Sequence, residues 1–177
     1  MADWLAPTGS PSNPLLVEHV QATWDKIRPN SAIYNILLSN IRIISAANGR
    51  IVAHLPLESV HLNSKRILHG AVSGTLCDWA GGMAIAATGV DKTGVSTDMH
   101  LSYVSTAREG DTLEIEAWVS KAGRNLGYTS FEIRKALPED VEAARPGRLD
   151  RRGAVVATGS HTKYLNFGEA RPVPLDI

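Results

Sequence analysis

The sequence contains a single cysteine, Cys77, among 177 residues, so no disulfide can form within the chain. One thiolate also excludes a zinc site built from several cysteines, and this sparing use of cysteine is typical of a reducing compartment. The charges balance, because 18 lysines and arginines are matched by 18 aspartates and glutamates. No net charge therefore favours nucleic acid or an anionic membrane as a partner, and any anion must be bound by a local group of cations.

Long apolar runs are absent from the sequence as well. The longest apolar stretch, residues 76–90, is interrupted by Asp78 and is shorter than the about 20 residues that a membrane-spanning helix needs. The first basic residue is Lys26, so neither a signal peptide nor an arginine-rich transit peptide is expected. We therefore predict a cytoplasmic protein with no membrane partner, and a mitochondrial location is the alternative.

The length fits one domain of ordinary size. Residues 1–14 are rich in proline, serine and glycine, which predicts a flexible N-terminal arm. Residues 136–152 are charged and contain proline, which predicts a solvent-exposed loop inserted into a domain that spans residues 15–165. Residues 166–177 are expected to form a C-terminal tail.

Hydrophobic periodicity predicts two helices. Apolar residues recur at helical spacing over residues 15–28, and Pro29 ends this pattern, which indicates a surface helix with one apolar face. Residues 71–88 are rich in alanine and leucine and apolar nearly all round, which indicates a helix that is buried on most sides. We expect this second helix to form the core of the domain.

Strand patterns fill much of the remaining sequence. Asn48-Gly49 predicts a hairpin, because this turn needs two positive φ angles that asparagine and glycine tolerate. Apolar and polar residues alternate over residues 112–119, which predicts one covered sheet face and one that is partly wet or meets a partner. The six expected strands cover residues 40–47, 50–57, 95–103, 112–120, 128–135 and 154–164. This order predicts an α+β domain in which one antiparallel sheet wraps the central helix, the hotdog arrangement.

Asp78 lies near the middle of the apolar helix, where burial of an unpaired carboxylate is costly. Its neighbours on the same helical face are Gly74, Gly81 and Gly82, each of which costs about 0.5–1 kcal/mol relative to alanine. The bare face either leaves room for a ligand beside the carboxylate or admits a neighbouring helix against a satisfied core aspartate. These residues by themselves favour neither interpretation.

His69-Gly70 stands at the expected start of this helix. The backbone N–H of Gly70 would be an unsatisfied donor at the positive end of the helix dipole, where a developing oxyanion is stabilised. The alternative is an ordinary helix N-terminus with His69 as a loop residue.

Two other arrangements of reactive residue types have simpler explanations. Ser96, Asp98 and His100 alternate along one expected strand, and side chains stacked in this way do not make the geometry of a serine-hydrolase triad. Asp98 and His100 are expected to be structural or to lie at a rim. We interpret Cys77 as a small buried hydrophobe, with a nucleophilic thiol as the alternative.

Asn63, His69-Gly70, Asp78 and the run from Gly94 to Met99 together resemble the hotdog thioesterases of the phenylacetyl-CoA and 4-hydroxybenzoyl-CoA type, especially the small eukaryotic acyl-CoA thioesterases. The similarity is continuous from about residue 39 to residue 165. It includes the segments 103–107, 121–126 and 159–165.

The resemblance implies hydrolysis of acyl-coenzyme A thioesters to free acid and coenzyme A, without a cofactor or a metal. It implies that Asp78 acts as general base on a water or as nucleophile, and that the N–H of Gly70 polarises the thioester carbonyl. Asn63 and Ser96 would help the attacking water, and His69 would support the loop. Each site would combine Asp78 and Ser96 of one subunit with Asn63 and Gly70 of another, so the implied assembly is a homodimer or a tetramer of two dimers.

Coenzyme A carries several phosphates, so a chain without net charge must gather local cations. Lys121, Arg124 and Lys163 lie on or beside segments that resemble the family, and we predict that they bind the substrate. Each is equally compatible with an ordinary solvated cation. The further candidates are Arg108, Arg151 and Arg152.

The sequence departs from the family at three places. Ala71 stands where many relatives have a second glycine, residues 138–152 are extra, and Trp79 stands where smaller residues are usual. We predict that Trp79 shapes the acyl pocket. Two other functions stay open: a non-catalytic module that binds acyl thioesters, and a hotdog dehydratase or hydratase. The latter needs a histidine at the active centre, and residues 71–88 contain none.

Overall fold

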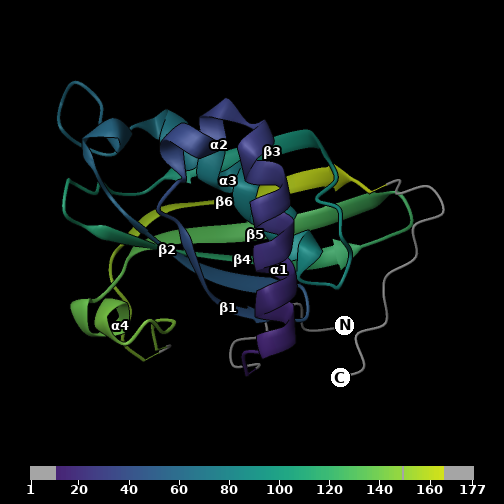
Figure 1. Ribbon diagram of the computed structural model, residues 1–177. Coiled ribbons are helices and arrows are strands. Elements are labelled where there is room, and N and C mark those ends of the chain that lie inside the picture. Colours follow the sequence, from purple (N-terminus) through teal and green to yellow (C-terminus); the bar gives the residue numbers. More distant parts are fainter. Residues whose placement is uncertain (1–10, 149, 166–177) are drawn as a thin grey trace.

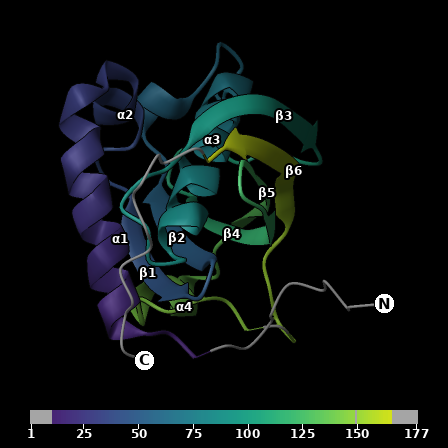
Figure 2. The same cartoon turned by 90° about the vertical axis from the view of Figure 1, so that its right-hand side faces the viewer.

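One antiparallel sheet curves around helix α3 (Gly70–Ala86) in the computed structural model, which describes residues 11–148 and 150–165 (Figures 1 and 2). The six strands lie in the order β1-β2-β4-β5-β6-β3. They are β1 (Arg42–Ala47), β2 (Arg50–Pro56), β3 (Val95–Tyr103), β4 (Thr112–Ala122), β5 (Leu126–Lys135) and β6 (Val155–Tyr164). The predicted α+β hotdog arrangement is confirmed, and β3 forms one edge of the sheet.

The predicted hairpin joins β1 and β2, with Ala47 paired to Arg50 across the turn. Gly49 has a φ of 70°, in the left-handed region that favours glycine, whereas Asn48 is not among the positive-φ residues. The hairpin is therefore confirmed, but the expectation of two positive φ angles in its turn is wrong.

Helix α1 (Pro14–Ile27) packs against β1 and α3 (Figure 2). The Asn13 side chain caps its first turn by accepting a hydrogen bond from the N–H of Leu15 at 3.0 Å. Trp24 is fully buried and meets Trp79 of α3 edge-on, with ring centroids 5.8 Å apart. Large aromatic side chains stabilise such contacts by burying apolar area, so this pair fixes α1 on the central helix.

The glycines of α3 admit side chains from the sheet and from the loop that follows the helix. A Cβ on Gly81 would lie 2.8 Å from Nδ1 of His161, and one on Gly82 would lie 3.0 Å from Cβ of Thr93. Gly74 has open space in front of it, since no atom of the described residues beyond its own stretch of helix lies within 4 Å of a Cβ built there. The bare helical face is thus partly filled by the sheet and the loop, not by a neighbouring helix, and partly left open.

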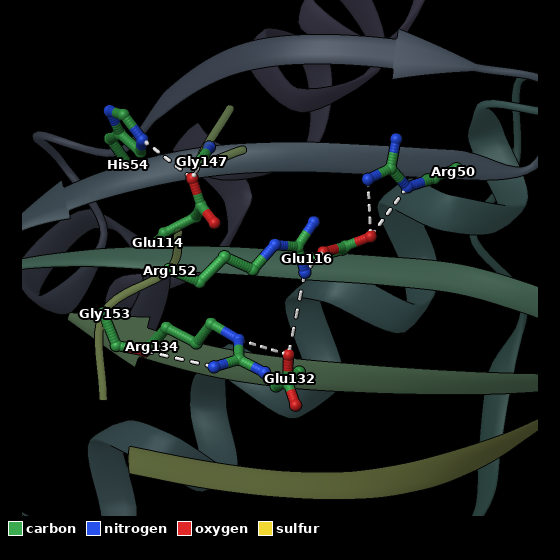
Figure 3. Close-up of polar contacts among 9 residues, drawn as sticks. All are labelled: Arg50, His54, Glu114, Glu116, Glu132, Arg134, Gly147, Arg152 and Gly153. Carbon is green, nitrogen blue, oxygen red and sulfur yellow. Dashed lines mark hydrogen bonds and ion pairs between the residues drawn. The ribbon is translucent and has the colours of Figure 1, made fainter. Parts of the chain in front are cut away.

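Most described residues of the segment 136–152 are exposed or half-buried, but the expectation of a loop without regular structure is wrong. The segment contains the short helix α4 (Pro138–Glu142), whose Asp140 is buried. The N–H of Gly147 donates to Glu114 at 2.5 Å, so the segment covers the side of β4 that points away from α3 (Figure 3). The other side of the sheet at β4 is therefore covered by the chain itself.

A network of charged residues lies beneath this segment. Glu116 of β4 accepts hydrogen bonds from Nε of Arg50 at 2.8 Å and from Nη1 of Arg152 at 2.7 Å (Figure 3). Glu114 and Glu116 are each only 4% exposed, although the sequence pattern predicts a partly wet face. Buried carboxylates need such partners, because an unpaired charge is costly away from water.

Shorter elements have no clear sequence signal. Helix α2 (Ala32–Leu37) spans too few residues for a periodic pattern, and Ser31 caps it by accepting from the N–H of Tyr34. The turns η1 (Arg28–Asn30) and η2 (Ser59–His61) are equally brief. Most of the predicted N-terminal arm and the predicted C-terminal tail lie outside the described residues, and α1 already begins at Pro14.

Arg152→Leu should lower the free energy of unfolding by about 2 to 3 kcal/mol, because it leaves buried Glu116 with one guanidinium partner in place of two. Urea unfolding measures this loss. Arg148→Leu is the matched control, since the ion pair of Arg148 with Asp150 is largely exposed and its removal should leave stability unchanged. Equal effects of the two changes would show that the buried network does not stabilise the fold.

Candidate active site

Asp78 opens onto a cleft of about 270 Å³ at the middle of α3. The cleft is bounded by Ile27 from α1, Tyr34 from α2 and Val95 from the start of β3. The side chain of Asp78 is 36% exposed, so the carboxylate is accessible from this cleft.

Three donors hold the carboxylate of Asp78. Its Oδ1 accepts hydrogen bonds from Oγ of Ser96 and from Nζ of Lys163, both at 3.0 Å. Its Oδ2 accepts a hydrogen bond from the hydroxyl of Tyr34 at 2.7 Å. These donors come from β3, β6 and α2, three elements that are far apart in the sequence. The carboxylate of Asp78 therefore has hydrogen-bond donors, as a core aspartate would, and it also borders a cleft that leaves room for a ligand. Features of both interpretations of the sequence are present.

These neighbours determine the charge of Asp78. Partial burial raises the pKa of its carboxyl, but the charge of Lys163 and the hydrogen bonds from Tyr34, Lys163 and Ser96 lower it, and the net result is a pKa below the usual range. Burial, followed by the hydrogen bond to Asp78, raises the pKa of Tyr34. At neutral pH the site therefore combines an anionic carboxylate with a neutral tyrosine donor.

His161 of β6 is a further neighbour of the carboxylate. Its Nε2 lies 3.9 Å from Oδ1 of Asp78, and its side chain is completely buried against Gly81. Burial, and then the charge of Lys163, lower the pKa of His161 to about 4. The imidazole is therefore neutral near pH 7 and cannot reach a substrate.

His69 and Gly70 lie at the N-terminus of α3, as predicted. Nδ1 of His69 accepts a hydrogen bond from the N–H of Ala71 at 3.0 Å, so this side chain caps the helix. Among the described residues, the N–H of Gly70 has no acceptor. Gly70 and Asp78 are eight positions apart on one helix, a rise of about 12 Å. One subunit therefore cannot bring both groups to the same carbonyl.

Asn63 lies in the loop that leads to α3, near His69 and away from Asp78. Its Oδ1 accepts a hydrogen bond from the N–H of Lys65 at 2.9 Å, which forms a tight Asx turn. The hydrogen bond from the N–H of His69 to the carbonyl of His61 ties the start of α3 to the same loop. Asn63 and Gly70 thus belong to one end of α3, and Asp78 and Ser96 to its middle.

The four predicted substrate-binding residues lie in different settings. Lys121 near the end of β4 and Arg124 in the turn before β5 are exposed. Lys163 is only 3% exposed, borders the cleft and donates to Asp78, so it lies beside the carboxylate, and its role in binding the substrate stays a prediction. Trp79 borders the cleft but is 1% exposed, because it belongs to the hydrophobic core, where its ring meets Trp24 edge-on.

Cys77 is fully buried, and burial, followed by the charge of Asp78, raises the pKa of its thiol to about 12. A thiolate nucleophile is therefore disfavoured, in keeping with the role of a small hydrophobe. The strand register shifts between Ser96 and Asp98, so the expected alternation of Ser96, Asp98 and His100 on one face is interrupted.

Sequence reasoning missed Tyr34 and His161 as neighbours of Asp78. His161 lies within the segment 159–165 that resembles the family, and that was the available signal. Tyr34 had none, because it lies on a helix too short to predict.

The sheet wrapped around a central helix defines a hotdog protein, and the carboxylate of Asp78 on that helix borders a cleft. Residues 66–142 match the thioesterase superfamily. Human acyl-coenzyme A thioesterase 13 is 33% identical over 129 residues, which cover 73% of this chain and 82% of the relative. The chain belongs to the thioesterase superfamily, and its predicted activity as a thioesterase is confirmed at this level.

Solved structures agree with this assignment. Zebrafish thioesterase superfamily member 2 superposes with a TM-score of 0.66 at 29% identity, covering 88% of this chain and 99% of that chain. A Streptococcus mutans protein solved with bound acetyl CoA shares the fold, with a TM-score of 0.59 at 22% identity over 71% of this chain and 87% of its own. None of the helices within the described ranges is long and apolar enough to cross a bilayer.

The low pKa of His161 predicts a specific pH dependence of stability. Its pKa is about 4 in the folded chain and near its usual value of 6.5 when unfolded, so the unfolded chain binds more protons between these values. The neutral ring of His161 therefore contributes to the free energy of unfolding above pH 6.5, and this contribution is lost as the pH falls toward 4. When the pH is lowered from 7 to 5, His161 should lower the free energy of unfolding by about 2 kcal/mol.

Urea unfolding at several pH values measures this effect. His161→Gln should remove that part of the slope, whereas His100→Gln, on an exposed strand position, should retain it. The same slope in wild type and His161→Gln would contradict the assignment.

Proposed function

We propose that this thioesterase hydrolyses acyl-coenzyme A thioesters to the free acid and coenzyme A, with Asp78 as the carboxylate that drives the reaction. The observation that carries the proposal is the anionic Asp78, held by three donors yet open to a cleft. The name of the human relative supports the substrate class. The bound acetyl CoA of the Streptococcus mutans protein is consistent with it at the level of the fold.

In this mechanism Asp78 takes a proton from a water in the cleft, and Ser96 helps to orient that water. The water oxygen attacks the thioester carbonyl, whose developing negative charge is stabilised by the N–H of the partner subunit's Gly70. The C–S bond then breaks, and the thiolate of coenzyme A leaves with the proton that Asp78 held. Direct attack by Asp78 would pass through an anhydride between Asp78 and the acyl group instead. Turnover in heavy-oxygen water distinguishes the two routes, because only the anhydride route labels the carboxylate of Asp78.

A homodimer follows from the separation of the two groups along α3. The edge strand β3 has exposed apolar side chains, among them Val95, Met99 and Tyr103, with 69%, 46% and 63% exposure. No strand lies on the outer side of β3 within the described residues, and such an edge is a template for another strand. Antiparallel pairing of two β3 strands would set two α3 helices side by side in opposite directions. This arrangement brings the helix start of one subunit toward Asp78 of the other, and a tetramer would join two such dimers.

The other candidate residues would contact the parts of the substrate that do not react, the coenzyme A phosphates and the acyl chain. Lys121 and Arg124 are exposed cations suited to the phosphates of coenzyme A. Ile27, Trp79 and Met83 give the cleft apolar walls suited to an acyl chain. The cytoplasmic location, with mitochondria as the alternative, stays a prediction.

The two alternative functions have less support. A dehydratase or hydratase needs a histidine that reaches the substrate, and although His161 lies beside Asp78 its side chain is fully buried. A binding module without turnover would have no use for an accessible, ionised carboxylate within the helix. Hydrolysis needs no exposed histidine and uses an accessible, ionised carboxylate, so it accounts for both observations.

Asp78→Asn should reduce thiol release from acyl-CoAs by about 100-fold or more, because the amide cannot accept a proton at neutral pH. The assay is free-thiol release from a panel of aromatic and aliphatic acyl-CoAs and acyl carrier protein thioesters. Asp25→Asn, on the exposed side of α1, is the matched control and should retain wild-type rates. Full turnover by Asp78→Asn, or binding of every thioester by wild type without thiol release, would sink the proposal.

Subunit complementation tests the shared site. Asp78→Asn and Asn63→Ala chains, each inactive as homodimers, should regain roughly a quarter of wild-type activity when mixed at equal amounts and allowed to exchange, because half of the dimers then carry one intact site. Exchange is verified by native mass spectrometry. Mixed dimers without activity would mean that each site lies within one subunit.

A further inference from the structure

Tyr34 is brought to the site by a short helix, whose Leu37 also packs against the core. Helix α2 has only six residues, and its Ile33 and Ile36 are 59% and 60% exposed. Tyr34 is the half-buried residue between them, and its hydroxyl donates to Oδ2 of Asp78 at 2.7 Å. The hydroxyl of Tyr34 is therefore the group by which α2 contacts the carboxylate of Asp78.

The hydroxyl is held from two directions. Ser31 caps α2 and accepts from the N–H of Tyr34 at 3.3 Å, which fixes the backbone. The ring of Tyr34 meets Trp24 edge-on, with centroids 5.4 Å apart, which fixes the side chain against α1. Trp24 in turn contacts Trp79, the residue that follows Asp78 on α3. Donor and acceptor are thus attached to one rigid aromatic cluster.

The donors divide the two oxygens of the carboxylate unequally. An ionised carboxylate offers about two acceptor positions on each oxygen. Among the described residues, Ser96 and Lys163 both donate to Oδ1, whereas Tyr34 alone donates to Oδ2. Oδ1 is therefore saturated, and Oδ2 is the oxygen with an acceptor position left for a water or a thioester.

We propose that Tyr34 is a positioning residue for the reaction: by donating to Oδ2 of Asp78 it fixes the rotation of the carboxylate and leaves one acceptor position on that oxygen for the reacting group. The identity of the reaction rests on the proposed acyl-CoA hydrolysis, whereas the contact itself does not. Tyr34 acts through Asp78 and transfers no proton. The same hydrogen bond stabilises the carboxylate form, so Tyr34 also extends activity to lower pH.

Tyr34→Phe tests the role, because it removes the hydroxyl and keeps the ring that packs on Trp24. The acid limb of kcat/KM should move to higher pH by about one to two units, as expected for loss of a hydrogen bond to a charged group. On the pH plateau kcat should fall about tenfold with little change in KM, because the base is less well oriented. An unshifted acid limb together with a plateau kcat within about twofold of wild type would overturn the proposal.

Tyr128→Phe is the matched control, since Tyr128 is an exposed tyrosine of β5 away from the cleft. It should leave the acid limb and kcat unchanged. Thermal unfolding of both variants checks the fold, and a purely structural role of Tyr34 would lower the melting temperature without moving the acid limb.

A second measurement separates this proposal from the proposed function. Carbon-13 NMR titration of the Asp78 carboxyl needs no substrate, and its signal is assigned by its loss in Asp78→Asn. Tyr34→Phe should raise the pKa of Asp78 by a similar one to two units, roughly. If wild type hydrolyses no thioester, the proposed function fails while this titration still decides the role of Tyr34. An unchanged pKa of Asp78 would refute that role.

Discussion

The ionised carboxylate of Asp78 is the constraint on which the rest of the site depends. It stands in a helix that is otherwise packed on most sides, where a negative charge without partners would be costly. Lys163, Ser96 and Tyr34 compensate for this burial, and each is delivered by a different element of the fold. The elements β6, β3 and α2 must therefore close around α3 before Asp78 is held as an anion, which couples formation of the site to formation of the domain.

The length of α3 imposes the second constraint. Asp78 and the N–H of Gly70 are separated by about 12 Å along a rigid helix, whereas the proposed reaction needs both at one carbonyl group. Strand β3 has no neighbour on its outer side within the described residues, and the proposed dimer would use this edge to bring in a second copy of the chain. In that proposal the same helix supplies a carboxylate to one site and an oxyanion donor to another.

The segment of residues 136–152 changes what the opposite face of the sheet can do. The acidic residues of β4 on that face are buried beneath arginines and the backbone of Gly147, so this surface is occupied by the chain itself. The carboxylate of Glu116 is paired with the guanidinium groups of Arg50 and Arg152. This network therefore stabilises the fold and leaves these arginines engaged, so it is not an anion-binding site. The β3 edge differs from this face, because within the described residues it has no strand on its outer side and its apolar side chains are exposed.

The sequence by itself determined the fold class, the approximate positions of the six strands and the two longer helices, and the unusual place of Asp78, because strand alternation, the Asn48-Gly49 turn and a lone aspartate in an apolar helix are local patterns. It also indicated the thioesterase family. Only the tertiary structure decided what surrounds Asp78. Lys163 lies in a strand at the far end of the chain, and Tyr34 lies on a helix too short for any periodicity. Their meeting depends on how the sheet curves around α3, and no local pattern encodes distances between segments that are remote in sequence.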